Sequence, residues 1–154
     1  GSEMCKETVA DVFYIGGTKV GAMFGEAVVF THGNMPKNFV TLVKQHGALL
    51  AKGWLLGVQF DTLFTDNLYC RIARRANDAA DRIREVLVER GYTLTFDAPT
   101  NQIFITLDNE TSERLQRSVR LGFMEKADDT HTVMRICTSW ATTDKQVEQL
   151  IALL

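Results

Sequence analysis

The sequence lacks the features that mark several classes of protein. Its 154 residues contain no apolar run of membrane-spanning length and no signal-peptide pattern. Seventeen basic residues stand against nineteen acidic ones, a net charge of −2, so there is no basic excess of the kind that attracts nucleic acid or anionic membranes. We therefore expect a cytoplasmic protein with no nucleic-acid or membrane partner.

Cysteine is scarce, and the common catalytic constellations are missing. Cys5, Cys70 and Cys137 are an odd number without a CxxC pair, which indicates reduced thiols rather than a disulfide framework or a zinc site. Neither paired carboxylates, a Ser-His-Asp triad, a P-loop nor a metal-ligand cluster is visible, so we expect no metal. The three histidines are interpreted as structural or solvent-facing: His32, His46 and His131.

The first part of the chain reads as two strands followed by helices. Short runs rich in Val, Phe and Tyr at residues 11–15 and 26–30 predict strands, and the link between them is too short for a helical crossover. They should therefore pair antiparallel. Helices are predicted over residues 36–46, beginning at Pro36, and within residues 49–64. Two strands and a helix cannot cover both faces of a sheet, so this part is expected to be the end of a larger domain.

The rest of the chain predicts a self-contained unit. A helix with one apolar face begins at residue 68 and ends near Gly91, and strands follow at residues 92–96 and 102–107. A helix capped by the residues 111–113, a strand at residues 133–138 and a helix at residues 143–154 complete the order α-β-β-α-β-α. We expect an α/β chain in which residues 1–66 end a large domain and residues 67–154 form an α+β small domain.

One lysine has unusual surroundings in the stretch DVFYIGGTKVGAMFGEAVVF. Lys19 follows Gly17 and Thr18 in a bend of small residues between two strands that we expect to be interior. A lysine in a turn is most often a solvated surface charge. Small residues, however, let a ligand approach the backbone closely, and a desolvated lysine has a lowered pKa and becomes a nucleophilic amine. Pyridoxal 5'-phosphate (PLP), bound to a lysine as a Schiff base, is the cofactor that needs this arrangement.

The same stretch, followed by LVKQHGALLAKGWLLGVQF, resembles the second half of bacterial low-specificity threonine aldolases. These belong to the aromatic amino-acid β-eliminating lyase/threonine aldolase group of fold-type-I PLP enzymes. The later stretches TNQIFITL and MRICTSW also resemble that family. The resemblance implies that Lys19 is the Schiff-base lysine, that Thr18 and Gly17 contact the cofactor, and that the family's other cofactor-binding groups lie upstream of this chain.

The resemblance also implies roles for three further basic residues. Arg135 stands where the family has an arginine that binds the substrate α-carboxylate, a task suited to the bidentate guanidinium. Without the resemblance, an exposed arginine at a strand edge would be an equal interpretation. Lys44 matches a lysine of the active-site wall near a subunit interface, and the second basic residue that the family has there falls at Ala51 or Lys52, depending on a shift of one residue. Both lysines would otherwise be ordinary surface charges.

These observations predict the C-terminal part of a PLP-dependent lyase that cleaves threonine and similar β-hydroxy-α-amino acids to glycine and an aldehyde. The family implies a homo-oligomer, a dimer or a tetramer, acting on a small amino acid. A β-eliminating lyase or an aminotransferase on the same scaffold is one alternative. Another is an inactive fragment with only a structural or assembly role, and we expect the 154-residue chain by itself to be inactive.

Overall fold

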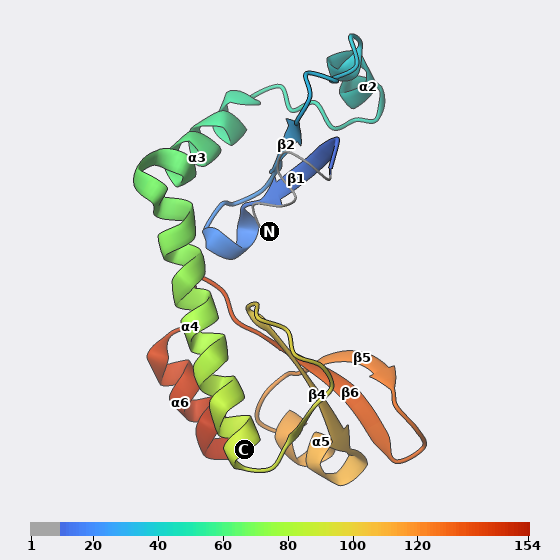
Figure 1. Ribbon diagram of the computed structural model, residues 1–154, viewed down its shortest axis with the longest axis vertical. Helices are drawn as coiled ribbons and strands as arrows, with labels where there is room; N and C mark the ends of the chain where they lie inside the picture. The colour runs from blue at the N-terminus through green and yellow to red at the C-terminus, as the bar shows by residue number, and fades with distance from the viewer. Residues whose placement is uncertain (1–9) are drawn as a thin grey trace. The chain divides into compact units, whose positions relative to one another are not determined.

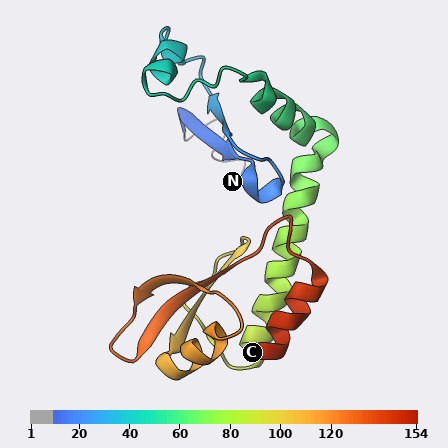
Figure 2. The same ribbon diagram turned by 180° about the vertical axis from the view of Figure 1, so that it is seen from behind.

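The protein consists of two compact units, shown in Figures 1 and 2, and the computed structural model describes residues 10–154. The first unit ends at Tyr69, and the second is Cys70–Leu154. The predicted domain boundary between residues 66 and 67 stays a prediction. Cys70 and Cys137 are free, exposed thiols, and Cys5 lies outside the described residues.

The first unit contains a two-stranded sheet and two α-helices. Its elements in chain order are β1 (Val12–Gly16), the 3₁₀ turn η1 (Thr18–Val20), β2 (Glu26–Phe30), α2 (Phe39–Gln45), α3 (Trp54–Phe64) and η2 (Thr65–Asn67). Strands β1 and β2 pair antiparallel, with Tyr14 opposite Val28, which confirms the predicted pairing. The first helix begins later than predicted, because the Phe39 N–H donates to the Pro36 carbonyl in a turn that precedes α2.

The second unit is a four-stranded antiparallel sheet with three helices. Its elements are α4 (Leu68–Glu89), β3 (Thr93–Leu94), β4 (Gln102–Asp108), α5 (Asn109–Gln116), β5 (Gly122–Lys126), β6 (His131–Cys137) and α6 (Asp144–Leu153). The strand order is β3-β4-β6-β5, and Figure 1 labels β4, β6 and β5 of this sheet. Strand β5 is absent from the predicted order, which is therefore corrected to α-β-β-α-β-β-α.

The core of the second unit lies between the sheet and its helices. Along β4 the side chains alternate, so that Ile103, Ile105 and Leu107 are buried while the residues between them are only partly buried. The buried residues of the helices complete the core: Ala80, Ile83, Leu87, Leu115, Val147 and Leu150. Because all three helices contribute to this one cluster, they cover one face of the sheet, and the opposite face carries residues such as Phe104 and Arg135.

Local chemistry explains where two of these helices end or begin. Gly91, with a left-handed φ of 78°, follows α4 close to the predicted end, and the Tyr92 N–H donates to the Leu87 carbonyl there. At the start of α5 the Asp108 carboxylate accepts a 2.8 Å hydrogen bond from the Thr111 N–H. The cap predicted within residues 111–113 is therefore wrong, because Asp108 occupies the N-cap position.

Residues 10–154 contain neither a membrane-spanning helix nor a cluster of metal-binding side chains. None of their helices is long and apolar enough to cross a membrane. No group of three or more His, Cys, Asp or Glu side chains within the same range is arranged to hold a metal ion.

Candidate functional site

Lys19 lies in the middle of the η1 turn that joins β1 to β2. The Gly17 carbonyl accepts hydrogen bonds from the N–H groups of Val20 (3.0 Å) and Ala22 (2.9 Å), and Gly21 closes the turn with a φ of 100°. These bonds fix the backbone on both sides of the lysine. The Lys19 side chain is exposed, and none of the described residues forms a hydrogen bond or an ion pair with it. The turn thus presents a free amine on an ordered backbone.

Helix α3 holds this turn from one side. Gly17 is buried, and a Cβ atom there would lie 3.2 Å from the Phe60 ring. At Gly25, whose φ is 88°, a Cβ would lie 2.2 Å from Cδ2 of Leu56. The Gln59 side chain accepts a 2.7 Å hydrogen bond from the Met23 N–H. The glycines are therefore needed for the close approach of α3, whereas the sequence suggested only the approach of a ligand.

Tyr69 provides a further anchor for the Lys19 turn. Its hydroxyl donates a 2.8 Å hydrogen bond to the Gly16 carbonyl, at the end of β1. The Tyr69 ring also lies 5.8 Å from that of Phe64, which in turn lies 5.7 Å from that of Phe60. A series of aromatic rings thus connects this end of β1 with α3. Sequence reasoning missed Tyr69, because its partner is 53 positions away along the chain.

In the 154 residues by themselves, the strands that flank Lys19 are not interior and the lysine is exposed, so its burial in a larger domain stays a prediction. Alternate residues of β1 and β2 are exposed, among them Tyr14 at 70% and Val28 at 49%. A two-stranded sheet can bury its apolar side chains only against other elements, and α3 covers the η1 turn rather than the strands. The apolar composition of the strands was recognised correctly, but the chain by itself does not bury them.

Arg135 lies on the central strand β6 of the second unit, on the sheet face opposite the helices. It pairs with Phe104 of β4 on one side and with Gly122 of β5 on the other. Its Nη1 donates a 3.2 Å hydrogen bond to the Gln102 side-chain carbonyl. Its Nε is buried and has no hydrogen-bond partner in the described part of the chain. The guanidinium therefore has one hydrogen bond, from Nη1 to Gln102, and a buried Nε–H group that lacks an acceptor.

The two later stretches that carry the family resemblance are neighbours in space. TNQIFITL contains all of β4 except Asp108, and MRICTSW contains the second half of β6, from Met134 onward. These strands pair antiparallel. At their ends the Thr138 N–H donates to the Asn101 carbonyl (3.0 Å), and the Asn101 side-chain amide donates to the Thr138 carbonyl (2.7 Å). The buried Thr138 hydroxyl donates to the Ala76 carbonyl of α4 at 2.6 Å. This network fixes the strand that carries Arg135.

The remaining basic candidates are exposed. Lys44 lies in the last turn of α2, and Lys52 lies in the turn before α3. Neither lysine side chain forms a hydrogen bond or an ion pair with a residue in the range 10–154. Lys19, Lys44 and Lys52 all belong to the first unit, whereas Arg135 belongs to the second. The roles of these four residues stay predictions.

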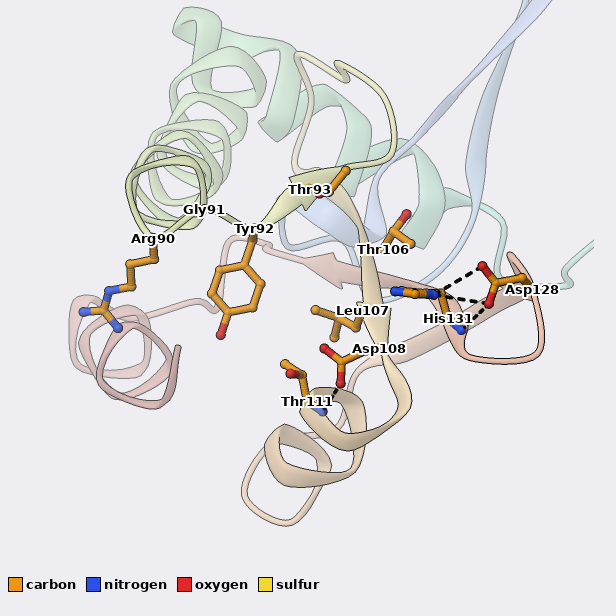
Figure 3. A pocket seen from close by; sticks show the side chains of 10 residues that line it. All are labelled: Arg90, Gly91, Tyr92, Thr93, Thr106, Leu107, Asp108, Thr111, Asp128 and His131. Carbon is orange, nitrogen blue, oxygen red and sulfur yellow. Dashed lines mark hydrogen bonds and ion pairs between the residues drawn. The ribbon is translucent and has the colours of Figure 1, made fainter.

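A cavity of about 540 Å³ opens on the second unit (Figure 3), and Arg135 is not part of its lining. Its lining includes an imidazole–carboxylate pair, His131 Nδ1 and Asp128 Oδ1, 3.2 Å apart. Hydrogen bonds from Thr130, and further ones from His131, hold the pKa of Asp128 well below its ordinary value. Because these groups complete the exposed turn between β5 and β6, they support the structural interpretation of His131.

A smaller cavity of about 240 Å³ includes Arg135 in its lining. Other polar residues share the lining, namely Arg120 before β5, Thr138 and Thr142 after β6, and Gln146 on α6. The rest of the lining consists largely of core residues such as Ile83 and Leu150. We assign no ligand to this cavity.

Two curated proteins that match this chain are both threonine aldolases. No protein-family model matches the sequence. The low-specificity L-threonine aldolase of Pseudomonas aeruginosa is 29% identical over 116 residues, which cover 75% of this chain and 34% of that protein. The enzyme of the same name from a Pseudomonas species is 27% identical over 152 residues, covering 98% of this chain and 43% of that protein. The chain therefore spans well under half the length of the curated relatives it matches.

Solved structures with a similar fold include a threonine aldolase as well. The threonine aldolase of Leishmania major has a TM-score of 0.88 and 38% identity, covering 94% of this chain and 42% of that one. A serine palmitoyltransferase of Sphingomonas wittichii has a TM-score of 0.62 at 17% identity, covering 93% and 38%. Another serine palmitoyltransferase structure, solved with PLP, has a TM-score of 0.62 at 13% identity and the same coverage. The predicted resemblance to the C-terminal part of threonine aldolases is confirmed, and so is the predicted α/β fold class of fold-type-I PLP enzymes.

Proposed function

We propose that this chain is the C-terminal part of a PLP-dependent lyase that cleaves threonine and related β-hydroxy-α-amino acids to glycine and an aldehyde. The observation that carries the proposal is the match to a threonine aldolase structure over 94% of the chain at a TM-score of 0.88. The more distant serine palmitoyltransferase structures share only the fold, at 17% and 13% identity, and therefore favour no other reaction.

Lys19 is the residue that we assign to the covalent attachment of PLP. Its amine has no partner among residues 10–154, and hydrogen bonds and the packing of α3 fix the backbone that carries it. Fixing the backbone reduces the conformational entropy that is lost when a ligand binds. The exposed Thr18 hydroxyl lies next to it in the chain and is a candidate hydrogen-bonding group for the cofactor. Gly17 stays a predicted contact through its backbone alone.

Arg135 is the residue that we assign to the substrate α-carboxylate. A buried N–H without a partner costs about 1–3 kcal/mol. The Nε of Arg135 is such a group, and none of the described residues forms an ion pair with this arginine. An anionic ligand would both satisfy hydrogen-bond donors and compensate the charge. A planar guanidinium suits a carboxylate because it can donate two parallel hydrogen bonds to it.

The chemistry of the cleavage divides between the cofactor and these two residues. When bound, PLP supplies an electron sink for the pair of electrons released at Cα as the Cα–Cβ bond breaks. Lys19 holds the cofactor in place before substrate arrives. Arg135 would bind the carboxylate and so orient the substrate.

We further propose that the enzyme is a cytoplasmic homo-oligomer in which Lys44 and Lys52 contribute to the active-site wall near a subunit interface. Both lysines lie in the first unit, where most of the exposed large apolar side chains also lie, including Trp54 at 65% and Val40 at 61%. Exposed apolar surface of this kind favours association with further protein.

The assignment of Lys19 can be tested by trapping the cofactor. The whole enzyme is incubated with PLP, reduced with borohydride and digested, and the modified peptide is identified by mass spectrometry. We expect the label on Lys19, no label in Lys19→Ala, and normal labelling in Lys37→Ala, which removes another exposed lysine of the same unit. Threonine cleavage, followed by release of the aldehyde, should disappear in Lys19→Ala and persist in Lys37→Ala. Label on a different lysine would refute the assignment.

A further inference from the structure

Gln102 is the only side chain within residues 10–154 that forms a hydrogen bond with Arg135. The donor is Nη1, the acceptor is Oε1, and the two atoms lie 3.2 Å apart. This is the long end of the usual range for an N–H···O bond, and a pair with a carboxylate is shorter and roughly twice as strong. The amide therefore holds the arginine less strongly than a carboxylate ligand would.

The strand register explains why Gln102 meets Arg135. Arg135 lies opposite Phe104, and Gln102 is two residues before Phe104, so all three side chains lie on the same face of the sheet. On the other side of β6, a Cβ atom at Gly122 would lie 3.5 Å from Nε of Arg135. The Arg135 side chain thus extends between Gly122 and Gln102, and the hydrogen bond to Gln102 orients its guanidinium group.

The neutrality of the Gln102 side chain matters as much as its position. A glutamate of the same length would form an ion pair with Arg135 and compensate its charge. The neutral amide fixes the guanidinium but leaves the positive charge uncompensated among the described residues. An arginine that is oriented and still cationic is suited to capture an anion from solution.

We propose that Gln102 is a positioning residue that holds Arg135 in a resting orientation and releases it to the substrate carboxylate. The inference rests on the proposed function, because it requires that Arg135 binds that carboxylate. On binding, the weak amide–guanidinium bond is exchanged for a charge-assisted pair, and the unsatisfied Nε can gain a partner as the side chain moves. A purely structural Gln102 would tie β4 to β6 without affecting substrate affinity.

Steady-state kinetics of the whole enzyme with threonine test this proposal. Gln102→Glu should raise KM by about 10-fold or more while kcat changes by less than about 3-fold, since an internal carboxylate competes with the substrate for Arg135. Lowering the pH toward protonation of the new glutamate should reverse part of this KM increase, and the wild type should not show that recovery. Gln102→Met, which keeps the length but lacks an acceptor, should raise KM by about 2- to 5-fold.

Two further variants separate the inference from the proposed function. Gln149→Glu adds the same charge at an exposed position of α6 and should keep the wild-type KM. Arg135→Ala should lower kcat/KM by about 10- to 100-fold, and lysine should rescue it poorly. If Arg135→Ala is impaired but both Gln102 variants keep the wild-type KM, the role of Gln102 is refuted alone. If Arg135→Ala has the wild-type KM, the carboxylate site is refuted as well. If Gln102→Glu fails to fold, the KM of Gln102→Met decides.

Discussion

A Cβ atom at Gly17 would lie 2.6 Å from the Cβ of Ala22 and 3.2 Å from the Phe60 ring. Both neighbours are buried, and Phe60 is fixed in α3, so little room exists for them to move. The turn that carries Lys19 therefore requires a residue without a side chain at position 17. Any enlargement of Gly17 must displace either the turn or the helix.

Gly17→Ala should destabilise the Lys19 turn by about 1–3 kcal/mol, the usual cost of overpacking a well-packed site. Hydrogen exchange of the Val20 and Ala22 amides measures this directly, because both amides donate to the Gly17 carbonyl. Gly16→Ala is the matched control, since a Cβ atom there would meet nothing within 4 Å. Equal exchange rates in the two variants would contradict the packing interpretation.

The residues of this turn show what the sequence could and could not reveal about the candidate site. The position of Lys19 between two antiparallel strands could be predicted, because both strands lie close to it in the sequence. The reason for Gly17 and Gly25 is not, because Phe60 and Leu56 approach them from a helix far along the chain. Gln102 was part of a recognised stretch, but its contact with Arg135 depends on a strand register that only the fold defines.

At the scale of elements, the stability of the first turn of α5 should depend on pH. Hydrogen bonds from the Thr111 backbone and side chain hold the pKa of the Asp108 carboxyl below its ordinary value of 3.8. Because the pKa is lower in the folded state, the charged Asp108 cap contributes its full stabilisation of α5 above a pH of about 4. This stabilisation is lost as the pH falls through the folded-state pKa of Asp108. The helix N-terminus also favours the charged form of this cap.

Asp108→Asn should remove that part of the acid dependence, since asparagine keeps an acceptor at the cap without a titrating group. The measurement is the protection of the α5 amides against hydrogen exchange between pH 2 and 7, compared with the wild type. Asp78→Asn removes an exposed aspartate that has no hydrogen-bond partner in the described range, and it should follow the wild-type profile. An unchanged acid profile in Asp108→Asn would contradict the role of the cap.

Strand β5 shows why part of the fold could not be predicted. Its sequence, GFMEK, contains a glycine and two charges and has no period-two pattern. It pairs only with β6, and the register of that pairing shifts between Phe123 and Glu125. By contrast, β4 alternates between buried and partly buried residues, and the buried face of α4 repeats at helical spacing, so both were predictable.

At the scale of the whole molecule, exposed apolar side chains concentrate in the first unit. Val12, Tyr14 and Val28 belong to the two-stranded sheet and are 46%, 70% and 49% exposed. The register pairs Tyr14 directly with Val28, so these two side chains share one face. A two-stranded sheet with an uncovered apolar face is marginal in water and presents open edges to other chains.

We therefore expect the 154-residue chain to self-associate through this sheet. Sedimentation velocity should show a concentration-dependent increase in size, and the double variant Tyr14→Lys/Val28→Glu should shift the protein toward the monomer, because charges on the shared face oppose its burial. Val88→Lys changes an equally exposed apolar residue on α4 of the second unit and should leave the association intact. A wild-type chain that stays monomeric at all concentrations, or a double variant that associates as the wild type does, would show that the β1–β2 face is not the contact.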